Sequence, residues 1–211
     1  MSQARVQTST FAARLGATIQ CGHCQRAIEK GEKYRWFKVG FRSRYKHIRC
    51  FRSDCTPRMS ELESSLLSGA YSAIEGAEDT LRALDSSDPE DDTSNIDAAV
   101  NEAADGVREV ADQYREAADA MGSAGEALEE KAQEIEDAVF ELESFSVTGE
   151  SEPDYDQCDD SDHDESTDDD GKAIEPVERG DSGCSKCMEI KQDWWTSAVQ
   201  EGFDALSNVS L

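Results

Sequence analysis

The sequence predicts a small α+β module followed by a mainly α-helical antiparallel bundle or coiled coil. Within residues 21–58, cysteines at metal-ligand spacings flank a segment rich in aromatic and β-branched residues, which is typical of a metal-held β-hairpin. Within residues 59–149, apolar residues recur every three or four positions among many acids, which is typical of amphipathic helices. Only 37% of the 211 residues are hydrophobic and 7% are aromatic, so one large buried core is excluded.

Composition divides the chain into five segments. We expect a disordered leader over residues 1–20, the metal-held module over 21–58, an acidic helical bundle over 59–149, a disordered acidic linker over 150–182 and an amphipathic helix over 183–211. The linker holds fifteen acidic residues and two basic ones, so it buries too little apolar surface to offset its ordering entropy. The leader lacks the apolar stretch of a secretory signal.

The first two thiols of the module, Cys21 and Cys24, have the two-residue spacing of a zinc knuckle. A second group, His47, Cys50 and Cys55, lies in and just after the second strand of the hairpin, and it offers one ligand too many for a tetrahedral site. Strand alternation places Cys50 and His47 on opposite faces, which favours Cys50 with Cys55 as the second pair. We therefore predict a Zn²⁺ site formed by Cys21, Cys24, Cys50 and Cys55, with His47 as the alternative ligand.

The remaining elements follow from local patterns. Residues 33–39 and 44–50 are strand-like and flank a turn at Gly40, and a helix is expected to begin just after Cys55. One apolar stripe runs from residue 59 to 84, a connector covers 85–94, and a second stripe begins at Ile96. Gly122 and Gly125 predict a turn between antiparallel helices, because two glycines in a helix interior cost about 2 kcal/mol.

In the last segment, four positions fall on one helical face, and a short amphipathic helix of this kind docks on its own bundle or on a partner protein. These positions are Trp195, Val199, Gly202 or Phe203, and Leu206.

A second set of candidate ligands reads C-x4-H-x20-C-x2-C and consists of Cys158, His163, Cys184 and Cys187. The number and type of ligands suit zinc. The alternative is a set of reduced, incidental thiols, since two of the four residues lie in the acidic run.

Charge divides the chain into a basic head and an acidic remainder. Residues 1–60 carry 13 Lys and Arg against three acidic residues, a net charge of +10, whereas residues 61–211 carry a net charge of −36. Cations interleaved with planar rings in residues 25–52 are typical of a nucleic-acid surface, and the alternative is pairing of these cations with the acidic remainder. The predicted contact residues are Arg35, Trp36, Lys38, Arg42, Arg44 and Lys46.

Two stretches carry a resemblance to a known group of proteins. Residues 28–35 read I-x-K-G-E-x-Y-R and residues 46–62 read K-H-x-R-C-x4-C-x-P-R-x-S-x-L. This combination, followed by acidic Ala-rich helices, resembles uncharacterised zinc-finger proteins of tailed bacteriophages. The resemblance implies an intracellular phage protein and places His47, Cys50 and Cys55 in one motif, but it implies no activity.

A weaker resemblance covers about thirty residues. The I-x-K-G run at residues 28–31 and H-I-R-C-F at 47–51 are similar to the zinc fingers of poly(ADP-ribose) polymerases, which bind DNA breaks. That resemblance implies Cys21, Cys24, His47 and Cys50 as ligands, and it leaves Cys55 without a role.

Two classes of function remain. In the first, the module binds nucleic acid and the acidic helices or the C-terminal helix bind a protein partner. In the second, the protein is an interaction or inhibitor protein whose acidic helices engage a basic host surface, and the zinc module is structural. We expect no enzyme, because phosphate-binding loops and nucleophile motifs are lacking in the sequence. We also expect no membrane association and a cytoplasmic location, in the host cell if the protein is phage-encoded.

Overall fold

The computed structural model describes residues 7–9, 19–39, 47–63, 66–90, 92–147, 153–158, 166–167, 173–174, 178, 180 and 184–211. For residues 7–9, 37–39, 47–49, 157, 166–167 and 173–174 only the backbone is described. The chain forms two compact units, and the boundary between them crosses three helices. Unit 1 comprises residues 1–75, 105–139 and 211, and unit 2 comprises residues 76–104 and 140–210.

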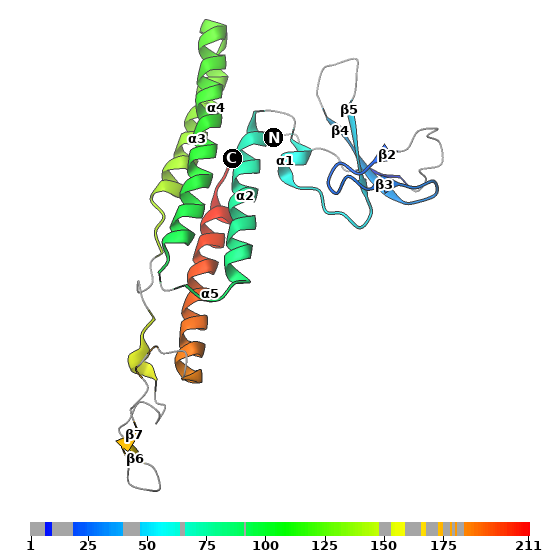
Figure 1. Ribbon diagram of the computed structural model, residues 1–211. Coiled ribbons are helices and arrows are strands. Elements are labelled where there is room, and N and C mark those ends of the chain that lie inside the picture. The colour runs from blue at the N-terminus through cyan, green and yellow to red at the C-terminus, as the bar shows by residue number, and fades with distance from the viewer. Residues whose placement is uncertain are drawn as a thin grey trace. The chain divides into compact units, whose positions relative to one another are not determined.

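The head of unit 1 is built from two small antiparallel sheets (Figure 1). The first has strand order β1-β4-β5, with β1 at Gln7–Ser9, β4 at Tyr34–Val39 and β5 at His47–Arg52. The second pairs β2, Ile19–Gln20, with β3, Ala27–Ile28. The predicted hairpin is present, because β4 and β5 pair from Val39 with His47 to Tyr34 with Arg52. The Gly40 turn itself lies outside the described residues.

Two short stretches of the segment predicted to be a disordered leader are described, and both are strands. β1 lies along β4, with Gln7 opposite Trp36, and β2 supplies one half of the second sheet. The physical reason is that β4 and β3 would otherwise be edge strands with unpaired backbone groups, which the early residues satisfy. This pairing is non-local, so the composition of residues 1–20 gave no indication of it.

Among the described residues, the helical part contains four long α-helices and one short one. Short α1, Met59–Leu62, is followed by α2, Leu67–Asp85, and by α3, Ser94–Met121. A 3₁₀ turn at Gly122–Ala124 leads into α4, Glu126–Glu143, and α5 spans Ser185–Asn208. The structure thus confirms an α+β layout that is mostly helical, and it confirms the connector before α3.

The first predicted helix is interrupted. α1 begins at Met59, three residues later than expected, and Glu63 has an extended backbone that ends it. Ser60 donates its backbone N–H to the Glu75 carboxylate over 3.2 Å. In one continuous helix these two residues would lie about 22 Å apart along the axis, so this contact requires the break.

The turn between α3 and α4 is the one that the glycines predict. Gly122 has a φ of +57°, which a residue with a side chain adopts only at a cost. At Gly125 a Cβ atom would lie 2.7 Å from the Ala118 Cα, so the chain reverses without room for a side chain. Arg115 on α3 then pairs with Glu136 on α4, and the two helices run antiparallel (Figure 1).

In unit 2, α5 packs on the end of α2 and the start of α3. Trp195 is fully buried and its Nε1 donates to the Leu84 carbonyl oxygen over 3.1 Å. A Cβ at Gly202 would lie 3.1 Å from both Leu81 and Ile96, so the helices approach closely there. The predicted face of α5 is confirmed, and it docks on its own chain: Trp195, Val199, Gly202 and Leu206 are all buried.

Short stretches of the segment predicted to be a disordered acidic linker are also described. Tyr155–Gln157 forms a 3₁₀ turn, Ser166–Thr167 (β6) pairs with Ala173–Ile174 (β7), and Cys158 is buried. Cys158 lies against two cysteines that come later in the chain, and this contact organises a segment whose composition alone indicates disorder. Across the part of the chain that the structure describes, none of the helices has the length and apolarity that crossing a membrane requires.

The close approach of α2 and α3 in unit 1 makes a testable prediction. A Cβ at Gly106 would collide with the Cβ of Ala73, so Gly106→Ala should destabilise the protein by about 1 to 3 kcal/mol through overpacking. Gly76→Ala is the matched control, because its Cβ would enter open space in a helix. The control should stabilise by about 0.5 to 1 kcal/mol. Urea unfolding of both variants measures the difference, and equal effects would contradict the packing described.

Candidate metal centres

The knuckle that carries Cys21 and Cys24 is the turn between β2 and β3. Cys21 N–H donates to the Arg26 carbonyl over 2.9 Å, and Gln25 N–H donates to the Cys21 carbonyl over 3.1 Å. Gln25 has a φ of +59°, the left-handed conformation that closes the turn. These bonds turn the chain so that both thiols lie on the same side of the head.

β5 is tied to this knuckle at two points on either side of Phe51. Gly22 N–H donates to the Cys50 carbonyl over 2.8 Å, and Arg52 N–H donates to Cys21 Sγ over 3.4 Å. A Cβ at Gly22 would lie 3.1 Å from the Phe51 ring, so a small residue suits this position. Phe51 itself is fully buried and forms the core of the head with Ile28 and Tyr34.

Three thiols meet in the head: Cys21, Cys24 and Cys55 have their Sγ atoms within 4.8 Å of one another. Cys55 reaches the knuckle because its N–H closes a turn onto the Arg52 carbonyl at the end of β5. Cys55 Sγ lies 3.4 Å from Cys24 Sγ. Two thiolates on one tetrahedral zinc ion lie about 3.8 Å apart, as follows from a Zn–S bond of about 2.3 Å. This group could bind a metal ion.

The surroundings favour the thiolate form at one of these positions. The backbone N–H of Arg26 first, and then the Cys55 thiol and the Arg26 guanidinium, together lower the pKa of Cys24 to about 6, partly opposed by burial. Conversely, the bond to Cys24 and then burial raise the pKa of Cys55 to about 12. A thiol beside a thiolate keeps its proton, and a cation that binds both sulfurs would displace it.

The fourth predicted ligand, Cys50, is not part of the three-thiol group. It lies on β5 opposite Trp36, is half-buried and packs against the core that contains Cys21. Burial first, and then the nearby Cys21 sulfur, raise the pKa of Cys50. Cys50 is therefore close to the group without joining it. The alternative ligand His47 begins β5 opposite Val39, and its side chain lies outside the described residues.

Sequence reasoning missed the role of two arginines that support this group. Arg52 donates from Nε to Asp54 over 3.0 Å, and from its NH1 nitrogen to the Ala27 carbonyl over 3.2 Å. Its guanidinium therefore joins β5 to β3 and is engaged within the head. The side chain of Arg26 bonds the Cys24 sulfur, which raises the arginine's pKa. From the sequence, both residues counted only toward the net charge of the head, and a basic residue two positions after a candidate ligand cysteine was the available signal.

A second group of three thiols lies in unit 2. Cys158, Cys184 and Cys187 also have their Sγ atoms within 4.8 Å of one another, and all three are buried. Cys184 is the N-cap of α5, and its Sγ accepts the Cys187 N–H over 3.4 Å. This group could likewise bind a metal ion. The fourth residue of the predicted set, His163, lies outside the described residues.

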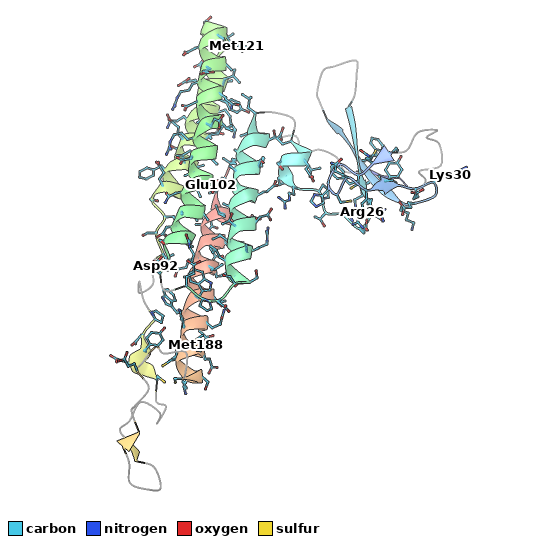
Figure 2. All side chains as sticks on the ribbon, viewed as in Figure 1. Arg26, Lys30, Asp92, Glu102, Met121 and Met188 are labelled. Carbon is cyan, nitrogen blue, oxygen red and sulfur yellow. The ribbon has the colours of Figure 1, made fainter. Side chains whose placement is uncertain are left out.

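The predicted nucleic-acid contacts are placed only in part. Arg35 and Trp36 are half-buried on β4, and Trp36 packs against the core of the head. Lys38 lies on the same strand, and Arg42, Arg44 and Lys46 lie outside the described residues. Arg26 and Lys30, on the exposed surface around β3, extend the basic character of the head (Figure 2).

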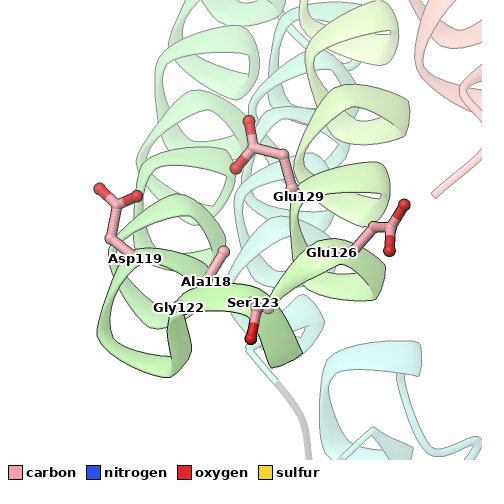
Figure 3. A pocket seen from close by; sticks show the side chains of 7 residues that line it. Ala118, Asp119, Gly122, Ser123, Glu126 and Glu129 are labelled. Atoms are coloured by element: carbon pink, nitrogen blue, oxygen red, sulfur yellow. The ribbon is translucent and has the colours of Figure 1, made fainter.

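A depression with acidic residues in its lining lies at the α3–α4 turn. Its lining includes Asp119, Glu126 and Glu129, whose carboxylates point in different directions (Figure 3). A divalent cation needs several oxygens converging at about 2 to 2.6 Å, which this arrangement does not offer.

Comparison of the chain with protein-family models, curated proteins and solved structures finds no match. The two thiol groups and the distribution of charge are therefore the features that bear on function.

Proposed function

We propose that this is a zinc-binding protein of the phage type that its motifs resemble, with a head that binds nucleic acid and acidic helices that bind or orient a protein partner. The observation that carries the proposal is the thiol group of the head, which supports a hairpin within a segment of net charge +10. Phosphate groups are attracted to such a basic surface at long range, and they are repelled by the acidic remainder of the chain.

Zinc is the metal that suits the head. Thiolate ligands select zinc among the divalent ions that prefer soft donors, and closed sites with four protein ligands are structural. Cys21, Cys24 and Cys55 supply three sulfurs. Cys50, packed against the same core, is the fourth ligand in our proposal, and His47 is the alternative. Such a module, with a knuckle, a hairpin and a following helix, is treble-clef-like or ribbon-like.

The bound zinc would act on the hairpin rather than on a substrate. It would join the β2–β3 turn to the end of β5, and β5 in turn fixes β4, which carries Arg35 and Lys38. The core that these strands share is small, so it stabilises their positions only weakly. The metal would therefore hold the cationic strand in a defined position. A fixed array of cations loses less entropy on binding phosphate than a flexible one does.

The test is the salt dependence of nucleic-acid binding by the full chain. Arg42, Arg44 and Lys46 are changed together to alanine, and the affinity for labelled single strands, duplex DNA and RNA is followed by fluorescence anisotropy over a range of salt. If each cation contacts one phosphate, the plot of log K against log salt on single strands should become shallower in the variant, with the magnitude of its negative slope reduced by about 2. Arg35→Ala should decrease it by about 0.7.

The matched control removes the same charge from the helices. Arg82, Arg108 and Arg115 each pair with acidic residues on their own helix, and changing all three to alanine should leave the salt slope unchanged. Trp36→Ala is less informative, because Trp36 packs on the core of the head. If the unmodified chain shows no salt-sensitive affinity for any DNA or RNA form, the nucleic-acid proposal fails.

A specific observation also favours the second class of function. Phe140 on α4 is 72% exposed, and acidic neighbours surround it on the same helix, among them Asp137, Glu141 and Glu143. A large ring within a field of carboxylates suits a partner with a basic, partly apolar surface. The apolar face of α5 is already buried on its own chain, which leaves the acidic helices for this role.

A further inference from the structure

We propose that Cys158, Cys184 and Cys187 hold a second metal ion of the thiophilic, zinc-like class, which joins residues 153–158 to the start of α5. This site is separate from the head and does not depend on its function. The observation is the convergence of three buried thiols from two segments, with Cys158 lying 26 residues before Cys184.

Among the residues that the structure describes, the cluster has little apolar material around it. Its buried members there are the three cysteines, and Tyr155 and Ile190 are the partly buried side chains packed on them. Ordering one residue costs about 1 to 2 kcal/mol in backbone entropy, and residues 153–158 belong to a strongly acidic segment. Burial of a few thiols does not offset that cost, whereas coordination of a metal ion does.

The backbone around the cluster is arranged for sulfur as an acceptor. Cys187 N–H donates to Cys184 Sγ over 3.4 Å, and Gly180 N–H donates to Cys187 Sγ over 3.4 Å. Cys184 also occupies the N-cap of a 24-residue helix, so its sulfur lies at the positive end of the helix dipole. Backbone N–H groups thus fix the positions of two sulfur atoms that a metal ion would bind.

Gly180 shows that the chain is shaped closely around this cluster. Its φ is +87°, which favours glycine, and a Cβ there would lie 2.8 Å from the Tyr155 ring. The ring of Tyr155 thus packs against backbone that has no side chain, and this backbone donates to Cys187. The 3₁₀ turn at Tyr155–Gln157 then presents Cys158, whose Sγ lies 3.7 Å from Cys184 Sγ.

The rival interpretation is a disulfide between Cys158 and Cys184, which would leave Cys187 as a free thiol. A disulfide needs an oxidant and consumes two thiols, whereas metal binding keeps all three sulfurs reduced and releases their protons. The two interpretations therefore differ in metal content and in the number of thiols recovered after denaturation.

The experiment counts metal ions in the full chain, purified with reductant and measured by elemental analysis. Wild-type protein should hold two ions per chain. The double variant Cys21→Ser, Cys24→Ser should hold one, which isolates the second site from the head. Adding Cys158→Ser to that variant should reduce the count to zero, and so should adding Cys187→Ser. Met188→Ser, an exposed sulfur residue next to the cluster, is the matched control and should keep the count at one.

Cobalt reports the ligand type at the isolated site. In the double variant, Co²⁺ should produce the near-ultraviolet absorption of a sulfur-to-metal charge transfer, which Cys187→Ser should abolish while helix content by circular dichroism is preserved. A metal-free double variant would overturn the proposal, as would a second ion that survives Cys158→Ser. A Cys158–Cys184 disulfide found by mass spectrometry in the reduced preparation would also overturn it. Loss of the head's ion alone bears on the proposed function and leaves this site standing.

Discussion

Cys55→Ser is expected to remove one metal ion per chain and to unfold residues 19–58, while the long helices remain folded. The described core of the head is small, since the buried residues among those that the structure describes are Ile28, Tyr34 and Phe51 beside two cysteines. Structural zinc in finger peptides contributes about 10 to 16 kcal/mol of apparent binding free energy at pH 7. A core of this size cannot replace that contribution, so loss of a ligand abolishes the fold of the head.

Metal analysis and the dispersion of backbone amide signals in NMR spectra measure the two effects in the full chain. Ser53→Ala is the matched control, because Ser53 is an exposed residue of the same turn. Parallel variants assign the fourth ligand: loss of the ion in Cys50→Ser supports Cys50, and loss in His47→Ala supports the three-cysteine, one-histidine set. Full metal content in Cys55→Ser would refute the thiol group as a metal site.

Trp195→Ala should destabilise unit 2 by about 3 to 5 kcal/mol, the range for truncating a large buried aromatic residue. The side chain is fully buried and it donates to a carbonyl in the last turn of α2, where helix carbonyls lack partners within their own helix. Trp194→Ala provides the control at the adjacent position, because Trp194 is only half-buried. Guanidinium unfolding monitored by circular dichroism at 222 nm measures both variants. Equal losses would contradict the asymmetry of α5.

Sequence patterns predicted the helical part well because it is governed by local rules. The three-four spacing from Ile96 to Met121 predicted one face of α3, and Val100, Val107 and Tyr114 on it are buried, whereas Met121 at its end is exposed. Gly122 marked the turn because it adopts a positive φ. On α5, the stripe through Trp195 and Val199 was correct for the same reason. The break after α1 was not predicted, since the apolar stripe continues across Glu63 while the backbone does not.

Contacts between distant segments were the part that sequence patterns could not give. Strand alternation ranked Cys50 above His47, but it could not say that the turn after β5 brings Cys55 to Cys24 while Cys50 stays outside the group. The burial of Cys158 depends on Cys184, and the acidic composition around Cys158 indicated disorder. Which thiols meet is decided by turns and caps that pair residues 26 to 31 positions apart.

The contact between Trp195 and Leu84 spans 111 residues, and this separation determines the order in which unit 2 can form during synthesis. At about 5 to 20 residues per second, the ribosome adds Trp195 roughly 5 to 20 seconds after Leu84. During that interval the side chains of Leu81 and Ile96 lack the helix α5 that covers them in the folded protein. The nascent chain therefore carries an apolar strip flanked by carboxylates until α5 is made, and the charge of those carboxylates opposes close approach between neighbouring chains.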